Sequence, residues 1–293
     1  MEHLSVFDPR IPIADLRLIE DVLRDQNILC TSFPDEDVYS VAFYDSQAEM
    51  YGIRVCVMLD RNVFARIVEL ANGCSAMPDH RIAAAVMASG QIANMTFEPA
   101  LAVYEGVATQ AENVAPHDLA MFQAADNVHP SEFADIALAR SSRLRSKLVP
   151  ADGAIESIPA QRIREYSFVY PLVLKMGLIE LEGGPMADRI RKFLDWTYGN
   201  WYMSAPATIL AAMCFSGSTP KGILKSLRDS NRDLALKGLR NCAWDLTYVT
   251  WWGELLKQQN QQNCLYLFCS RDKALRRVAQ QMLVLNCVNT HLY

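Results

Sequence analysis

The sequence lacks any apolar run approaching the roughly 20 residues that a membrane-spanning helix needs. Its first residues, Met-Glu-His-Leu, also lack the basic and then apolar plan of a signal peptide. We therefore expect a cytoplasmic protein with no membrane partner.

The sequence also lacks paired metal-binding or disulfide-forming motifs. Its eight cysteines are scattered, with no CxxC pair and no histidine at zinc-ligand spacing, so they read as reduced thiols. An excess of basic residues is missing too, because the net charge is -5. The chain as a whole should not attract nucleic acid, so a polyanion site would have to be local. Hydrophobic residues make up 51% and charged residues 21%, as in a packed globular protein.

The pattern of apolar residues predicts an α/β protein with a mostly parallel sheet. Residues 55–59 and 265–269 are continuous apolar runs rich in β-formers, which is typical of strands buried on both faces. Residues 107–237 have helical periodicity broken by proline and glycine. We predict a core formed by 1–106 and 238–293 with a helical insertion at 107–237. Within the core we expect a further strand at 38–43 and helices at 13–25, 62–70, 81–90, 239–256 and 274–285.

Acidic side chains follow both buried strands. Asp60 comes directly after the first run, and Asp272 comes three residues after the second. Since ligands gather at the carboxyl ends of parallel strands, these aspartates would meet at one edge. Glu105 and Asp245 could join them from flanking helices. Clustered carboxylates repel one another, and a hard divalent cation such as Mg²⁺ or Mn²⁺ relieves that repulsion.

These residues resemble the PIN domain ribonucleases and their relatives. That family has a strand running into Leu-Asp-Thr-Asn-Val, and residues 58–63 read Met-Leu-Asp-Arg-Asn-Val. Its second acid lies in a helix, to which 102–106 is a loose match. A later acid heads a helix, as in 244–246, and the last follows a strand as Thr-x-Asp, similar to Ser-Arg-Asp at 270–272. The resemblance covers about a third of the chain.

The resemblance implies a three-layer α/β/α sandwich and metal-assisted hydrolysis of phosphodiester bonds, in RNA or in single-stranded DNA. It implies that Asp60 is the principal metal ligand, with Glu105, Asp245 and Asp272 as further ligands or water-orienting groups. Glu98 is the reserve for Glu105. The remaining implied roles are hydrogen bonds to the carboxylates from Asn62 and Ser270, and nucleic-acid contacts from Arg61, Arg271 and Lys273.

Other interpretations stay open. Arg61 replaces the family's threonine, so its guanidinium could bind phosphate or occupy the metal's place in a non-catalytic binding module. The helical insertion could instead be the functional part, as a surface for protein partners, and a homo-oligomer or a protein inhibitor also remains open. An aspartate after a strand is often only a helix N-cap. The basic residues Arg140, Arg143, Arg145 and Lys147 could steer RNA, although a solvated helix end is the simpler reading.

Overall fold

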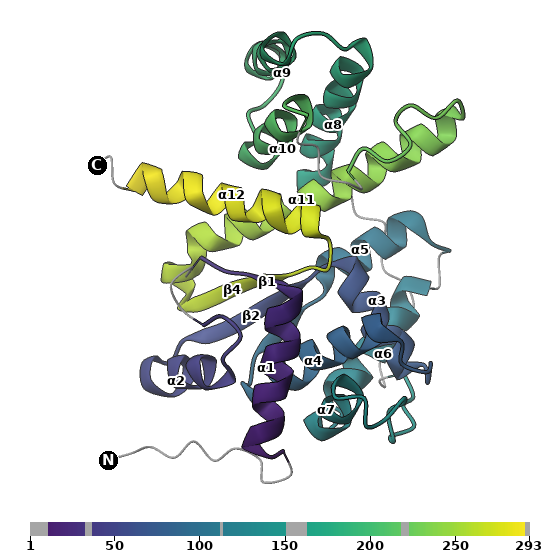
Figure 1. The fold of residues 1–293 in the computed structure, drawn as a ribbon, viewed down its shortest axis with the longest axis vertical. Helices are drawn as coiled ribbons and strands as arrows, with labels where there is room; N and C mark the ends of the chain where they lie inside the picture. The colour runs from purple at the N-terminus through teal and green to yellow at the C-terminus, as the bar shows by residue number, and fades with distance from the viewer. Residues whose placement is uncertain (1–10, 33–36, 112–113, 151–162, 218–222, 291–293) are drawn as a thin grey trace. The chain divides into compact units, whose positions relative to one another are not determined.

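The computed structural model describes residues 11–32, 37–111, 114–150, 163–217 and 223–290 (Figure 1). The chain divides into two compact units. Unit 1 comprises Met1–Ala160 and Leu256–Arg271, and unit 2 comprises Gln161–Leu255 and Asp272–Tyr293. The protein is mixed α/β and mostly helical, and its described residues contain no helix that is long and apolar enough to cross a membrane.

Unit 1 contains a four-stranded sheet with the order β1-β4-β2-β3. The long strands β2 (Arg54–Leu59) and β4 (Cys264–Cys269) pair in parallel, which confirms the two predicted buried strands. β3 (Thr96–Glu98) is also parallel to β2, whereas β1 (Leu29–Cys30) is antiparallel to β4. The sheet is therefore mostly parallel, as predicted.

Helices of unit 1 pack against one face of this sheet. Alternate strand residues such as Val57 and Leu267 join a buried core with Phe64 and Ile67, because successive side chains on a strand point to opposite faces. Helix α4 packs on α1, α3 and α7, and α3 packs on α5 and α6. The helices of this unit are α1 (Ile13–Gln26), α2 (Val41–Tyr51), α3 (Arg61–Ala71), α4 (Pro78–Ile92), α5 (Ala100–Thr109), α6 (Val114–Asp126) and α7 (Pro130–Ala137).

The strand predicted at 38–43 is wrong, because helix α2 begins there. The Ser40 side chain accepts a hydrogen bond from the backbone N–H of Phe43 at 3.2 Å, which is an N-cap contact. The N–H of Val41 donates to the Glu20 carboxylate at 2.9 Å. Two side chains thus satisfy N–H groups of the first turn, which leaves the chain helical rather than extended.

Unit 2 is helical. It contains α8 (Arg164–Glu182), α9 (Met186–Asn200), α10 (Ala205–Phe215), most of α11 (Arg232–Gln262) and α12 (Lys273–Thr290). The described residues of 107–237 are mostly helical, and they divide between the two units. Helices α6 and α7 bury their apolar faces against α3 and α4 and so belong to unit 1, whereas residues 238–255 and α12 belong to unit 2.

Candidate functional site

Asp60 lies at the carboxyl end of β2, inside unit 1. The last residue of β2, Leu59, is in register with Cys269 of β4, so Asp60 and Ser270 take equivalent places at the edge of the sheet. Ser270 Oγ donates a hydrogen bond to Asp60 Oδ2 at 2.7 Å, and Asn62 Nδ2 donates to the same oxygen at 3.2 Å. Asp60 is 2% exposed and Ser270 is 0% exposed. The structure thus brings together three of the residues singled out in the sequence.

Asp60 and Asp272 both precede helices, but their side chains behave differently. The Asp272 carboxylate accepts from the backbone N–H groups of Ala274 at 2.7 Å and Leu275 at 3.1 Å, so it caps the first turn of α12. Asp60 occupies the N-cap position of α3 but makes no side-chain cap. Helix capping therefore accounts for the Asp272 carboxylate, whereas Ser270 and Asn62 hold the buried Asp60 carboxylate.

Asp245 and Asp272 both lie in unit 2, where they act on the same buried thiol. Burial raises the pKa of Cys242 well above its ordinary value, and the charges of Asp245 and Asp272 raise it further. Asp245 lies well inside α11, which begins at Arg232, and not in the first turns of a helix as predicted. The positive end of the helix dipole therefore does not stabilise the Asp245 carboxylate.

The two glutamates considered for the second acid both lie in unit 1. Glu98 ends β3, in register with Met58 of β2, and its Oε1 accepts from the N–H of Ala100 at 2.9 Å at the start of α5. Glu105 lies within α5, which continues to Thr109, and its side chain is half-buried. Glu98 therefore sits at the same edge of the sheet as Asp60, whereas Glu105 comes from a helix, as expected.

Three cationic residues were expected to contact nucleic acid. Two of them contact protein groups, and the third is exposed to solvent. Arg61 Nη1 donates to the carbonyl of Ala102 at 3.0 Å, and its Nη2 pairs with Asp118 at 3.2 Å. Arg271 pairs with Asp79 at 2.5 Å, and Lys273 is exposed at the start of α12. Because the Arg61 guanidinium is bound by α5 and α6, these contacts place it against protein groups rather than a ligand.

The acids of the predicted metal site divide between the two units, with Asp60 and Glu105 in unit 1 and Asp245 and Asp272 in unit 2. Across the residues that the structure describes, no group of three or more His, Cys, Asp or Glu side chains is arranged to hold a metal ion. A preassembled cage of protein ligands therefore does not fit these residues. A site with fewer protein ligands, completed by water and substrate phosphate, is the form that Mg²⁺ usually takes. The convergence of all four carboxylates stays a prediction.

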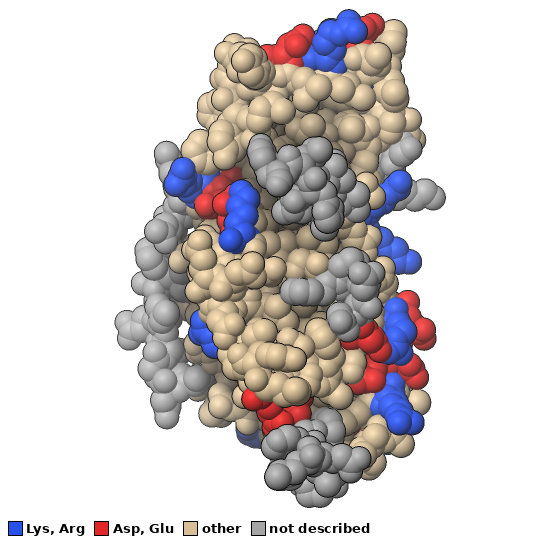
Figure 2. Space-filling view, turned by 90° about the vertical axis from the view of Figure 1, so that its left-hand side faces the viewer, with Lys and Arg blue, Asp and Glu red and all other residues tan. Residues whose placement is uncertain are grey.

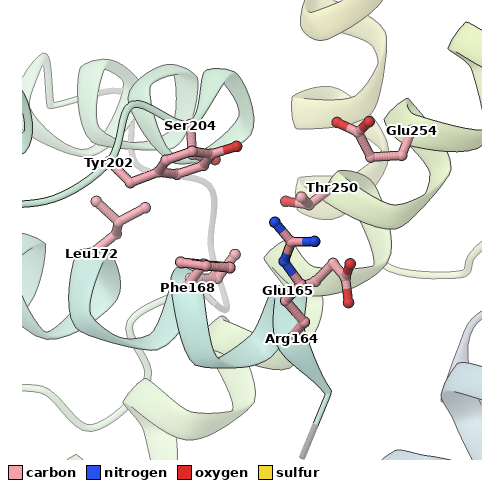
Figure 3. A pocket seen from close by; sticks show the side chains of 9 residues that line it. Arg164, Glu165, Phe168, Leu172, Tyr202, Ser204, Thr250 and Glu254 are labelled. Carbon is pink, nitrogen blue, oxygen red and sulfur yellow. The ribbon is translucent and has the colours of Figure 1, made fainter.

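Unit 2 contains a separate cavity of about 190 Å³ (Figure 3). The guanidinium of Arg164 points toward Thr250, and the rings of Phe168 and Tyr202 face one another with centroids 5.4 Å apart. Glu165 and Glu254 complete the polar lining. The lining thus combines a guanidinium, two carboxylates, the hydroxyls of Ser204 and Thr250, and aromatic rings. The sequence gives no signal for this cavity, because its walls come from three separate segments.

Comparison with protein-family models, with curated proteins and with solved structures finds no match to this chain. The functional inference therefore depends on the residues themselves.

Proposed function

We propose that the protein is a divalent-metal-dependent nuclease that hydrolyses phosphodiester bonds in RNA, with Asp60 as its principal metal ligand. The observation that supports this proposal is the buried carboxylate of Asp60 at the carboxyl end of a parallel strand. Burying a charge is costly unless it has partners or binds a cation. Ser270 and Asn62 are such partners, and a bound cation would stabilise the charge further. Ligands also gather at this edge of parallel sheets. The PIN-like arrangement of three layers belongs to the same proposal.

The residues around Asp60 would set the direction of its carboxylate. Ser270 and Asn62 donate to the same oxygen, Oδ2, which fixes how the group is turned. Hydrogen bonds of this kind orient metal ligands and tune their basicity. Glu105, in the same unit, is the further carboxylate of the proposal, and Arg271 its RNA contact. When bound, Mg²⁺ or Mn²⁺ would polarise the phosphate and activate the attacking water.

The proposal is tested by the substitution Asp60→Asn, which keeps the shape of the side chain and removes its charge. We expect hydrolysis of mixed RNA in Mg²⁺ or Mn²⁺ to fall at least about a hundredfold, in the range typical of losing a key electrostatic group. Glu49→Gln is the matched control, because Glu49 is an exposed acid of α2 in the same unit. Hydrolysis that withstands both chelator and Asp60→Asn would exclude the mechanism.

A second candidate is a non-catalytic binding module with the same fold. It is favoured by the lack, among the described residues, of a preassembled group of three or more metal-binding side chains. Calorimetric titration with Mn²⁺ separates the two candidates. A nuclease should bind the ion in the wild-type protein and lose it in Asp60→Asn, whereas the binding module should take up no Mn²⁺ in either form.

A cytoplasmic location is also part of the proposal. Cys56, Cys74, Cys242 and Cys264 are reduced thiols, which is usual where glutathione and thioredoxin keep cysteines reduced. Burial raises the pKa of Cys56 to about 12, so this thiol stays protonated and unreactive at neutral pH.

A further inference from the structure

A second open cavity lies in unit 1, at the far end of α3 from Asp60. Its volume is about 470 Å³, and its walls come from the end of α3, from α6 and from the segment 143–150. Three of the basic residues singled out in the sequence line it: Arg143, Arg145 and Lys147. His117 and Asn72 contribute further polar groups, and their side chains lie 3.2 Å apart. We call this cavity the basic groove.

The charges of the basic groove are of one sign. No aspartate or glutamate is among the described residues that line it. Arg145 pairs with Asp135 outside the lining, and Arg140 pairs with Asp15. Arg143 and Lys147 are exposed, and neither has an ion pair within the described part of the chain. Two cations that have no ion pair with any described residue therefore share one hollow, an arrangement that attracts anions.

Much of the remaining surface is mixed in charge. On the face shown in Figure 2, several Lys and Arg side chains lie beside Asp or Glu side chains. With a net charge of -5, the whole molecule repels polyanions weakly. An anion would therefore be drawn to a local basic feature and not to the surface in general.

The backbone of the segment that carries these cations is held in place by the buried carboxylate of Glu132. Glu132 is 8% exposed and accepts hydrogen bonds from the N–H of Arg145 at 2.6 Å and the N–H of Ser146 at 2.9 Å. Burial tends to raise its pKa, but the Ser146 and Arg145 hydrogen bonds outweigh burial and lower it, so the carboxylate stays charged. Leu144 and Leu148 pack against the core. The groove is thus organised before any ligand arrives, which reduces the entropy cost of binding.

Capping of α3 does not account for the cations. Basic residues often bind the last carbonyl groups of a helix. Here the carbonyl of Val68 accepts from the backbone and side chain of Asn72, and those of Glu69 and Leu70 accept from Cys74 and Gly73. Because these carbonyls already have partners, capping of α3 gives no reason for Arg143 and Lys147 to be basic.

We propose that the basic groove binds the phosphate backbone of single-stranded RNA. Several cations in one hollow match a ligand with repeated charges, and a nucleic-acid strand carries one phosphate per nucleotide. Helix α3 has 11 residues and separates Asp60 from the groove by about 16 Å. At the ~3.4 Å rise of a strand in a DNA duplex, roughly five nucleotides would cover that distance. Only this last step, which makes the bound RNA a substrate, rests on the proposed nuclease function.

The test is the salt dependence of RNA binding, measured by fluorescence anisotropy in EDTA with a labelled 12-nucleotide RNA of mixed sequence. In the double variant Arg143→Gln, Lys147→Gln we expect affinity to fall about tenfold at low salt. The slope of log affinity against log salt should also flatten by about 1.4, since each phosphate contact on a single strand contributes about 0.7. The matched control is Lys237→Gln, Arg240→Gln, which removes the same charge from exposed residues of unit 2.

The outcomes distinguish RNA binding by the basic groove from the proposed nuclease activity. Binding that is weakened in the groove variant and unchanged in the control supports the groove, even if the wild-type protein cleaves no RNA. Equal losses in both double variants, or wild-type protein that does not bind in EDTA, would overturn the proposal. Polyglutamate that competes as well as unlabelled RNA would also overturn it, because the groove would then recognise acidic polymers in general.

Discussion

At the scale of single residues, Arg61 lies next to the proposed metal ligand in the sequence, yet its side chain stabilises the packing of helices. Its guanidinium binds the carbonyl of Ala102 and the carboxylate of Asp118, and it lies 5.4 Å from the centre of the Phe64 ring. Arg61 and Asp118 are only 15% and 13% exposed. Removing one partner would leave the other half-buried and unsatisfied, which costs more than a surface ion pair contributes.

We therefore expect Arg61→Gln to lower the free energy of unfolding by about 1–3 kcal/mol. Urea denaturation followed by circular dichroism would measure the change. Arg66→Gln is the control, since Arg66 forms a more exposed pair with Glu69 one turn away, and its loss should cost less than about 1 kcal/mol. If Arg61→Gln left stability unchanged but weakened RNA binding in EDTA, Arg61 would be a ligand contact after all.

At the scale of secondary-structure elements, two glycines in helices differ in what surrounds them. A Cβ atom at Gly90 of α4 would come within 2.3 Å of the Phe97 ring in β3. Phe97 is buried and packs edge-on against Phe122, so it has little room to move. A Cβ at Gly199 of α9 would meet nothing within 4 Å.

These surroundings predict opposite signs for the same substitution. Gly90→Ala should destabilise the protein by about 1–3 kcal/mol, as overpacking usually does. Gly199→Ala should stabilise it by up to about 1 kcal/mol, because alanine favours a helix over glycine by that amount. Thermal melts of both variants would show the contrast, and a stabilised Gly90→Ala would mean that the contact between α4 and β3 is looser than described.

The elements also show which parts of the fold the sequence predicts. The runs 55–59 and 265–269 are readable as strands because β4 is buried at all six positions and β2 at four of its six. Residues 38–43 mix apolar and polar types in a way that fits either period, and the cap at Ser40 decides for a helix. β3 was not predicted because three residues are too few to show a period.

In the candidate site too, some contacts can be predicted from the sequence and others cannot. The contact of Asp60 with Ser270 is predictable, because each residue directly follows one of two strands that the pattern makes parallel neighbours. The pairing of Arg61 with Asp118 is not predictable, because it depends on how α3 and α6 pack. Helix α11 is longer than the predicted 239–256, because it runs from Arg232 to Gln262. Gly238 inside it accommodates the Lys225 carbonyl, 1.9 Å from where a Cβ would lie.

At the scale of the whole molecule, the order of the chain makes unit 1 dependent on a late segment. β4 lies inside the sheet between β1 and β2, but it follows unit 2 residues 161–255 in the sequence. β1 has β4 as its only strand partner in the described sheet. Leu265, Leu267 and Cys269 of β4 belong to the core of unit 1.

We therefore predict that a fragment of residues 1–160 does not fold cooperatively. It lacks the burial of Leu265 and Leu267, each worth roughly 1.5–3 kcal/mol, and the backbone partners of β1 and of one side of β2. Together these losses rival the 5–15 kcal/mol that typically stabilises a domain. Urea titration followed by circular dichroism should show a broad, non-cooperative change, and a synthetic peptide of residues 256–271 should sharpen it by restoring the missing strand. A steep transition from the fragment alone would show that the remaining helices hold a core without β4, and the parallel pair that carries Asp60 would then not be what organises unit 1.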